Sequence, residues 1–199
     1  IVNFLSRIAA KGFIVAGSQL RGSEGSQGID EFGGKSIGDV RTFLDLVKAL
    51  PYADSSRIAQ IGWSRGAITN FLLLKEIPNI NPTITIGGQS DILDTNRRIM
   101  FGVYRNRVPG YAADSVAASH AISPLYQLDS INKHSRLLFV HGTADEKVSV
   151  SNGRTMHRVA LEKGLLSELW EYEGGDHSLR PYFQVLAARI SEWLQNIFY

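Results

Sequence analysis

This sequence contains no cysteine. Disulfide bonds, thiolate metal sites and cysteine nucleophiles are therefore excluded from its chemistry. The absence fits both reducing and oxidising environments, so it does not indicate a compartment. No two histidines have the spacing that would place a pair of metal ligands on one helix, so we expect no metal site and no cofactor.

Long apolar runs and a strong excess of one charge are missing as well. No segment approaches the roughly 18 to 20 continuous apolar residues that a membrane-spanning helix requires, and the N-terminus lacks the pattern of a signal peptide. The 21 basic and 19 acidic residues leave a formal charge of only +2. We therefore expect neither a nucleic acid held by phosphate contacts nor a membrane as a partner.

What the chain does have is 199 residues, of which 44% are hydrophobic, enough for one domain with a sizeable core. Its apolar spacing alternates between that of helices and that of strands, which is typical of βα units around a parallel sheet. We expect strands at residues 13–16, 57–62, 83–86, 136–140 and 165–172. We expect helices at residues 1–11, 37–50, 67–76, 149–164 and 183–197. The prediction is a single α/β domain over residues 1–199, with a mainly parallel sheet and helices on both faces.

Residues 89–130 show no clean helix or strand period. We interpret them as an irregular, partly helical insertion between core strands. Two interpretations apply to the arginines of this segment. A solvated charged surface is the simpler one, and binding of a substrate carboxylate is the alternative. The arginines concerned are Arg97, Arg98, Arg105 and Arg107.

The strongest local signal is the G-x-S-x-G sequence from Gly62 to Gly66. It lies between an expected strand and an expected helix, as does the nucleophile elbow of a serine hydrolase. Such an elbow exposes its serine hydroxyl above the sheet, and both glycines are expected to avoid collisions with the neighbouring strand and helix. Ser64 is thus the candidate nucleophile, and the backbone N–H of Arg65 is a candidate donor to an oxyanion. The simpler alternative is that Ser64 only caps the following helix.

A polar turn follows the strand expected at residues 136–140. Asp145 lies in this turn, where a carboxylate can orient a histidine and stabilise its protonated form. Glu146, one residue further along, is the alternative acid. Asp91 and Asp94 follow an earlier strand and are weaker candidates, with turn formation as their simpler role.

His177 is the candidate general base. Of the five histidines it alone lies between the last expected strand and the last expected helix, in a glycine-rich turn. The chain order Ser64, Asp145, His177 is that of α/β-hydrolases and differs from the orders of chymotrypsin and subtilisin. His141 is expected to form local hydrogen bonds at a strand end. The remaining histidines are expected in loops or on helix surfaces, at His120, His134 and His157.

Three of these motifs resemble the catalytic domain of the prolyl-oligopeptidase family of serine hydrolases, at residues 62–67, 141–145 and 175–177. The loop at residues 20–25 and the segment 36–57 are similar to the same family, so the resemblance covers nearly the whole chain. It implies an α/β-hydrolase fold and acyl transfer through an acyl-enzyme. The motifs are shared with acyl-aminoacyl peptidases, dipeptidyl peptidases and related carboxylesterases.

The resemblance leaves the substrate open. Cleavage of a peptide or acyl-peptide bond is what the family motifs imply. A carboxylesterase acting on small esters is the alternative, because the sequence has no segment that could form the substrate-filtering propeller of many family members. An inactive hydrolase-like fragment or binding module is the second alternative.

Family members carry further strands before the helix expected at residues 1–11, and the loop after those strands supplies a second oxyanion donor. The sequence has no matching segment, so we expect either an N-terminally truncated form that lacks the first strands of the fold, or another source of that donor. The loss of one donor costs on the order of 100- to 1,000-fold in turnover. An open edge of a parallel sheet also favours self-association, which makes a homo-oligomer one expected outcome.

Overall fold

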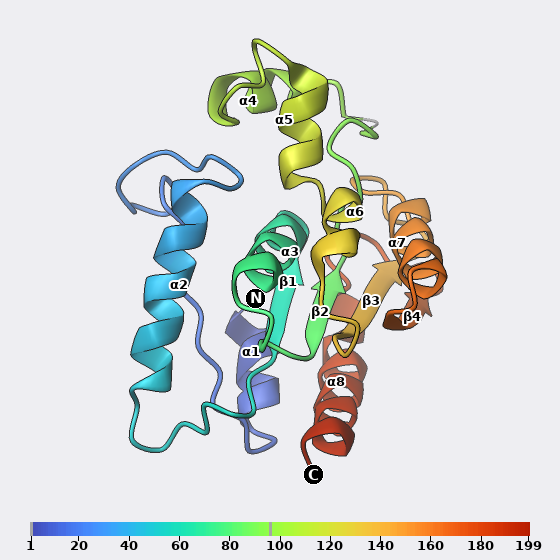
Figure 1. Ribbon diagram of the computed structural model, residues 1–199. Coiled ribbons are helices and arrows are strands. Elements are labelled where there is room, and N and C mark those ends of the chain that lie inside the picture. Colours follow the sequence, from blue (N-terminus) through green and yellow to red (C-terminus); the bar gives the residue numbers. More distant parts are fainter. Residues whose placement is uncertain (1, 96) are drawn as a thin grey trace.

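The computed structural model of the chain describes residues 2–95 and 97–199. Four parallel strands form one sheet, in which their spatial order follows their order along the chain. Thr83 in the second strand pairs with Gln60 in the first and with Leu137 in the third. All four strands point their carboxyl ends to the same edge of the sheet (Figure 1). The strands are β1 (Gln60–Trp63), β2 (Thr83–Ile86), β3 (Arg136–Gly142) and β4 (Leu166–Tyr172).

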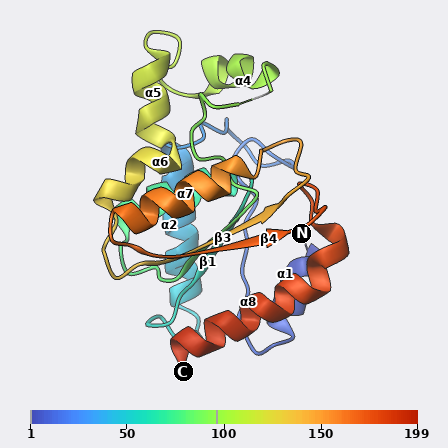
Figure 2. The ribbon, with the colours of Figure 1, turned by 90° about the vertical axis from the view of Figure 1, so that its right-hand side faces the viewer.

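Helices cover both faces of the sheet, as Figure 2 shows from the side. One face carries α1 (Val2–Ala9) and α8 (Phe183–Phe198), which pack against each other. The other face carries α3 (Gly66–Glu76) and α7 (Ser151–Glu162), and α2 (Lys35–Lys48) packs on the outside of α3. This layered arrangement confirms the predicted α/β class.

Alternate residues of the same strand fill the two cores. Leu138 and Val140 of β3 point into a cluster formed with side chains of α1 and α8. Leu137 and Phe139 point the other way, into a cluster formed with side chains of α3 and α7. Because both faces are covered, an interior strand must be apolar on both sides, which explains the continuous apolar runs in the sequence.

The segment between β2 and β3 is partly helical, as the sequence predicts. Two of its helices, α4 (Ile99–Arg107) and α5 (Ser115–Ile122), project beyond the carboxyl edge of the sheet (Figure 1). They pack through a small cluster that includes Tyr104, Val108 and Ile122. Apolar and polar residues are mixed around the circumference of α4 and of α5. The sequences of these helices therefore show little of the hydrophobic periodicity that marks an amphipathic helix. The elements are α4 (Ile99–Arg107), α5 (Ser115–Ile122), α6 (Pro124–Gln127) and the 3₁₀ turn η1 (Leu128–Ser130), while Asn96 lies outside the described residues.

The strand expected at residues 13–16 is not formed, so that prediction is wrong. The segment has no strand pairing, and Ile14 is 49% exposed. A strand needs hydrogen-bonding neighbours for its backbone, and no described strand pairs with this segment. The helix expected at residues 1–11 is present from Val2 to Ala9. Ile1, the first residue of the predicted helix, lies outside the described residues.

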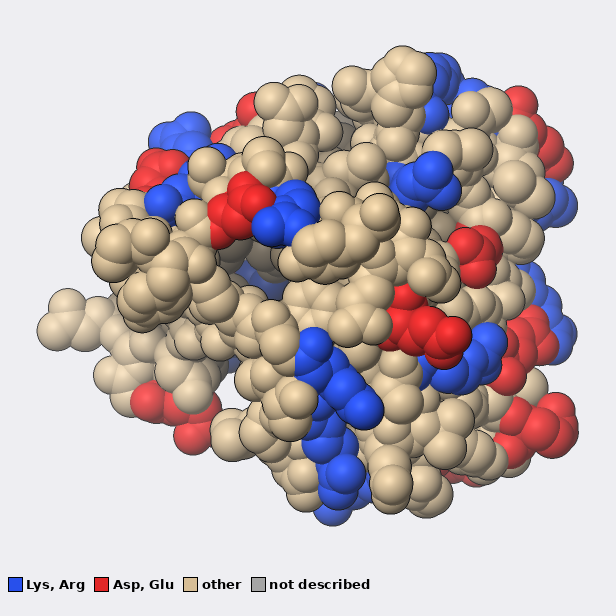
Figure 3. All heavy atoms as spheres, turned by 90° about the horizontal axis from the view of Figure 1, so that it is seen from below, with Lys and Arg blue, Asp and Glu red and all other residues tan. Residues whose placement is uncertain are grey.

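Charged side chains of both signs share the face at the amino ends of the strands. Lysine and arginine side chains form a band across this face, and acidic side chains lie on either side of the band (Figure 3). This mixture agrees with the formal charge of +2. Within the described part of the chain, no helix combines the length and the apolar character needed to cross a membrane.

The difference between β2 and residues 13–16 can be tested by two matched substitutions. Ile84 lies in β2 and is 0% exposed, so Ile84→Ala is expected to lower the free energy of unfolding by about 2–5 kcal/mol. Ile14→Ala, at a half-exposed position, is expected to cost less than about 1 kcal/mol. Urea unfolding followed by circular dichroism measures both values. Equal losses would contradict the exposed position of Ile14.

Candidate active site

Three of the predicted site residues meet at the carboxyl edge of the sheet, each from a different loop. Ser64 follows β1, Asp145 follows β3 and His177 follows β4. The Nε2 atom of His177 lies 2.9 Å from the Ser64 Oγ, and its Nδ1 atom lies 2.7 Å from the Asp145 Oδ2. Both distances are within hydrogen-bonding range. The fold therefore joins Asp145, His177 and Ser64 in one hydrogen-bonded line.

Ser64 occupies a sharp turn between β1 and α3. Its φ of +53° lies in the left-handed region, which residues other than glycine rarely adopt. The Ser64 N–H donates to the carbonyl oxygen of Ile86 at 2.8 Å, which ties the turn to β2. No side chain caps α3, and the Ser64 hydroxyl lies against His177 instead. The turn therefore has the strand-turn-helix geometry expected of an elbow, and the Ser64 hydroxyl does not cap α3.

The two glycines of the elbow have different roles. A Cβ added at Gly62 would lie 2.3 Å from the carbonyl oxygen of Gly66, so any side chain there would collide with the start of α3. A Cβ added at Gly66 would meet nothing within 4 Å. The expectation that both glycines avoid collisions is thus confirmed for Gly62 and wrong for Gly66, which faces open space.

The Asp145 carboxylate is buried beneath His177, with its side chain 1% exposed. Its Oδ1 atom accepts hydrogen bonds from the backbone N–H groups of Lys147 and Val148, both at 2.9 Å. Burial acts to raise the pKa of Asp145, but the hydrogen bonds from His177 and from these two N–H groups outweigh it and lower the pKa. The ionised carboxylate therefore stabilises the fold at neutral pH. That contribution is complete above the ordinary carboxyl pKa of about 3.9 and is lost as the pH falls through the lowered value.

The other acids considered from the sequence lie outside this line of hydrogen bonds. Glu146 is exposed. The Asp91 carboxylate accepts hydrogen bonds from the Tyr126 hydroxyl at 2.8 Å and from the Leu93 N–H at 2.9 Å. Asp94 is exposed in the same turn. The simpler interpretation of Asp91 and Asp94, as turn residues, agrees with these contacts.

The other four histidines take no part in the hydrogen bonds that join Asp145, His177 and Ser64. His141 is 1% exposed, and its Nε2 atom lies 2.9 Å from the carbonyl oxygen of Val148. Burial lowers the pKa of His141, so the ring is neutral at neutral pH. His120 and His157 contact neighbouring side chains from helix positions, and His134 is exposed in a loop. Across residues 2–95 and 97–199, no cluster of three or more histidine or acidic side chains could hold a metal ion.

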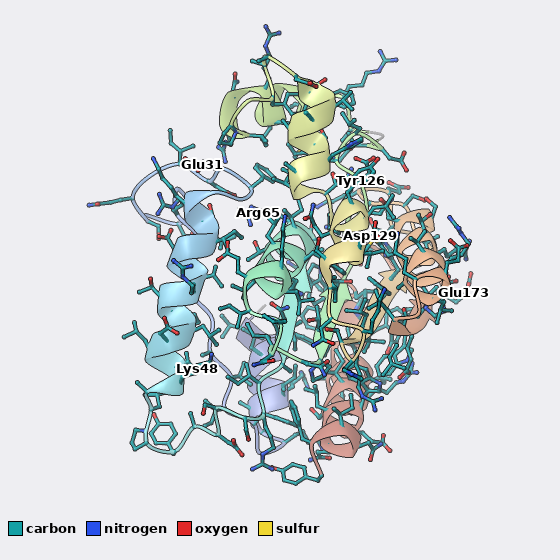
Figure 4. All side chains as sticks on the ribbon, in the orientation of Figure 1. Glu31, Lys48, Arg65, Tyr126, Asp129 and Glu173 are labelled. Carbon is teal, nitrogen blue, oxygen red and sulfur yellow. The ribbon has the colours of Figure 1, made fainter. Side chains whose placement is uncertain are left out.

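Arg65 has a buried partner that no local pattern in the sequence indicates. Its guanidinium forms an ion pair with Asp30, from the loop before α2, and donates to the Thr69 Oγ1 at 2.8 Å. It also lies 5.0 Å from the centre of the Phe32 ring. Figure 4 labels Arg65 at the start of α3. The backbone N–H of the same residue has no acceptor among the described residues, so the side-chain contacts anchor a residue that presents a free donor next to Ser64.

A polar pocket of about 110 Å³ opens beside the loop that carries Asp145. It lies between this loop and the segment that follows β2. The four arginines of the segment 89–130 are exposed and do not line it, which favours the solvated interpretation of their charge. The lining residues are Gln89, Asp94, Thr95, Lys147, Val148, Ser149, Ser151 and Asn152.

Comparison with known sequences gives a match over nearly the whole chain. The family profile described as "Prolyl oligopeptidase family" matches residues 3–199. The uncharacterized peptidase YtmA of Bacillus subtilis is 25% identical over 199 residues, which cover 96% of this chain and 75% of that protein. A probable dipeptidyl-aminopeptidase B of Ajellomyces capsulatus is 27% identical over 220 residues, which cover 99% of this chain and only 22% of that protein.

Comparison with solved structures concerns the fold of the chain. A putative alpha/beta hydrolase from Agrobacterium tumefaciens superposes with a TM-score of 0.67 and 19% sequence identity. The superposition covers 98% of this chain and 74% of the other. At this identity the likeness concerns the fold alone, and it confirms the α/β-hydrolase fold that the sequence motifs imply.

The unequal glycines of the elbow generate a prediction. Gly62→Ala is expected to lower the free energy of unfolding by at least about 2 kcal/mol, because the new methyl group overlaps the Gly66 carbonyl. Gly66→Ala is expected to leave stability unchanged or raise it by up to about 1 kcal/mol, because alanine favours a helix more than glycine does. Thermal unfolding of both variants measures the difference. A larger loss for Gly66→Ala than for Gly62→Ala would contradict this geometry.

Proposed function

Because this chain belongs to the prolyl oligopeptidase family, we propose that it is a serine hydrolase that cleaves peptide or acyl-peptide bonds through an acyl-enzyme. The observation that carries the proposal is the hydrogen-bonded line from Asp145 through His177 to Ser64. A serine-histidine-aspartate triad requires these groups in this order. The sequence relatives named as peptidases support a peptide bond as the target.

In the proposed mechanism the Ser64 Oγ attacks the carbonyl carbon of the substrate. The Nε2 atom of His177 lies 2.9 Å away and takes the hydroxyl proton as the new bond forms. Asp145 accepts a hydrogen bond from Nδ1, which selects the useful tautomer and stabilises the imidazolium. His177 then gives the proton to the leaving group, and an acyl-enzyme remains. A water molecule repeats the two transfers and releases the acid.

The backbone N–H of Arg65 is the proposed donor to the oxyanion of the tetrahedral intermediate. This group directly follows the nucleophile and lies at the N-terminus of α3, where the helix dipole favours negative charge. The ion pair between Arg65 and Asp30 supports this role, because it restrains the residue that carries the donor. A donor that is already oriented costs no reorganisation when charge develops.

Labelling with a fluorophosphonate, followed by intact-mass analysis, tests the nucleophile. We expect one adduct on the wild-type protein and none on Ser64→Ala, because the reagent needs an activated serine hydroxyl. A folded wild-type protein without an adduct would contradict the proposal. The alternative of an inactive hydrolase-like binding module would then be favoured.

The same reaction identifies the acid through a matched pair of variants. Asp145→Asn and Glu146→Gln each remove one carboxylate charge from adjacent residues. Asp145→Asn is expected to slow labelling of Ser64 and substrate turnover by roughly 1,000-fold or more, since the histidine loses its orienting partner. Glu146→Gln is expected to change both rates by less than about 2-fold, because this side chain is exposed and outside the hydrogen-bonded line. Equal rate losses in the two variants would remove Asp145 from the proposed mechanism.

A substrate pair separates the peptidase from the carboxylesterase. A peptidyl anilide and the ester of the same acyl group differ only in the leaving group. The proposed peptidase hydrolyses both compounds, and Ser64→Ala abolishes both activities, because one acyl-enzyme serves the two reactions. Release of the chromogenic amine measures the anilide reaction. Hydrolysis of the ester without hydrolysis of the anilide would assign the carboxylesterase activity instead.

A further inference from the structure

The loop that carries His177 is held by hydrogen bonds at almost every residue. Between β4 and the 3₁₀ turn η2 (Arg180–Tyr182), four backbone N–H groups of this loop donate to acceptors close by. The Asp176 carboxylate accepts two of them, at 3.0 and 2.9 Å. The donors are Gly174, Gly175, Ser178 and Leu179.

The main chain of His177 has a different partner. Its carbonyl oxygen accepts a hydrogen bond from the indole Nε1–H of Trp63 at 3.1 Å, across a sequence separation of 114 residues. Among the described residues, this is the one hydrogen bond made by the His177 backbone. Trp63 directly precedes Ser64, so the residue bonded to the candidate nucleophile also holds the candidate base.

The Trp63 ring is itself fixed by packing. It is half-buried and lies edge-on to Phe4 of α1, with ring centres 5.6 Å apart, and edge-on to Phe183 of α8, at 5.8 Å. Phe4 and Phe183 also contact each other, at 5.5 Å. Edge-to-face packing of this kind defines the orientation of an aromatic ring. The indole N–H therefore points at the His177 carbonyl from a rigid support.

We propose that Trp63 is a positioning residue, whose indole N–H keeps the imidazole of His177 aligned between Asp145 and Ser64. This role rests on the triad proposed above. During that reaction the hydrogen bond between His177 Nε2 and Ser64 Oγ breaks and re-forms. The imidazole ring therefore needs other contacts that persist throughout the reaction. Asp145 supplies one of them at Nδ1, and Trp63 supplies the other through the backbone.

The consequence of losing this restraint follows from the sensitivity of proton transfer to geometry. A misplacement of about 1 Å in a reacting group can cost on the order of 100-fold in rate. Trp63 holds the backbone of His177 and does not act through any atom of a substrate. Removal of its indole N–H is therefore expected to lower kcat and not to change KM. The same loss is expected in the reaction of Ser64 with a fluorophosphonate, which depends on the same base.

The test compares Trp63→Phe with Trp193→Phe. Each substitution removes an indole N–H and keeps an aromatic ring. Trp193 lies on α8, and its Nε1–H donates to the Glu168 carboxylate at 2.6 Å, a contact that does not involve the triad. In Trp63→Phe we expect kcat and the labelling rate of Ser64 to fall together by about 10- to 100-fold, with KM within about 3-fold. In Trp193→Phe all three quantities are expected to stay within about 2-fold of the wild type.

A measurement on the unaltered chain keeps the proposal testable even where Trp63→Phe does not fold. The chain has three tryptophans, so ¹⁵N-labelled indoles give three N–H resonances. Trp170→Phe and Trp193→Phe assign two of them, and the third belongs to Trp63. We expect phosphonylation of Ser64 to shift the Trp63 resonance and to leave that of Trp193 in place.

The results of these experiments distinguish a failure of the positioning role of Trp63 from a failure of the proposed triad. If Trp63→Phe is labelled at the wild-type rate, or if the Trp63 resonance does not respond to phosphonylation, the positioning role is wrong while the triad stands. If the wild-type protein itself takes no label, the triad fails, and the positioning role fails with it.

Discussion

The left-handed turn at Ser64 is the constraint on which the rest of the site depends. A φ of +53° is costly for serine, and the turn is supported by the hydrogen bond to Ile86 and by the missing side chain of Gly62. The two neighbours of Ser64 then point in different directions. Trp63 reaches the His177 loop, and Arg65 reaches Asp30. One strained turn thus places the candidate nucleophile, the backbone of the candidate base and a candidate oxyanion donor.

The parallel sheet supplies the other part of the arrangement. Parallel strands end at a common edge, so loops far apart in the sequence meet there. The site residues follow β1, β3 and β4, and β2 lies between β1 and β3. The residue after β2 is Gly87, where a Cβ would lie 3.3 Å from the His177 ring and 3.4 Å from the Asp145 Oδ2. Its φ of +56° also favours glycine. Strand β2 is therefore followed by a residue small enough for the hydrogen-bonded line to pass over it.

The sequence alone determined the elements whose signals are local. The strand at residues 83–86 has the bounds predicted from its sequence. The G-x-S-x-G sequence marks its turn because strand, turn and helix are contiguous. The order of Ser64, Asp145 and His177 could be read from the strand ends for the same reason. The apolar run at residues 13–16 was misleading, because a strand also requires a neighbour, and a neighbour is not a property of the segment itself.

Only the tertiary structure decided how these local pieces restrain one another. The hydrogen bond from Trp63 to His177 and the ion pair of Arg65 with Asp30 join positions 114 and 35 residues apart. Gly66 has the same residue type as Gly62 and a different steric role, which depends on what lies beyond its α-carbon. Hydrophobic periodicity records which face of an element is buried. It does not record which polar groups meet once the elements have packed, because that pairing is set by the positions of whole strands and loops in space.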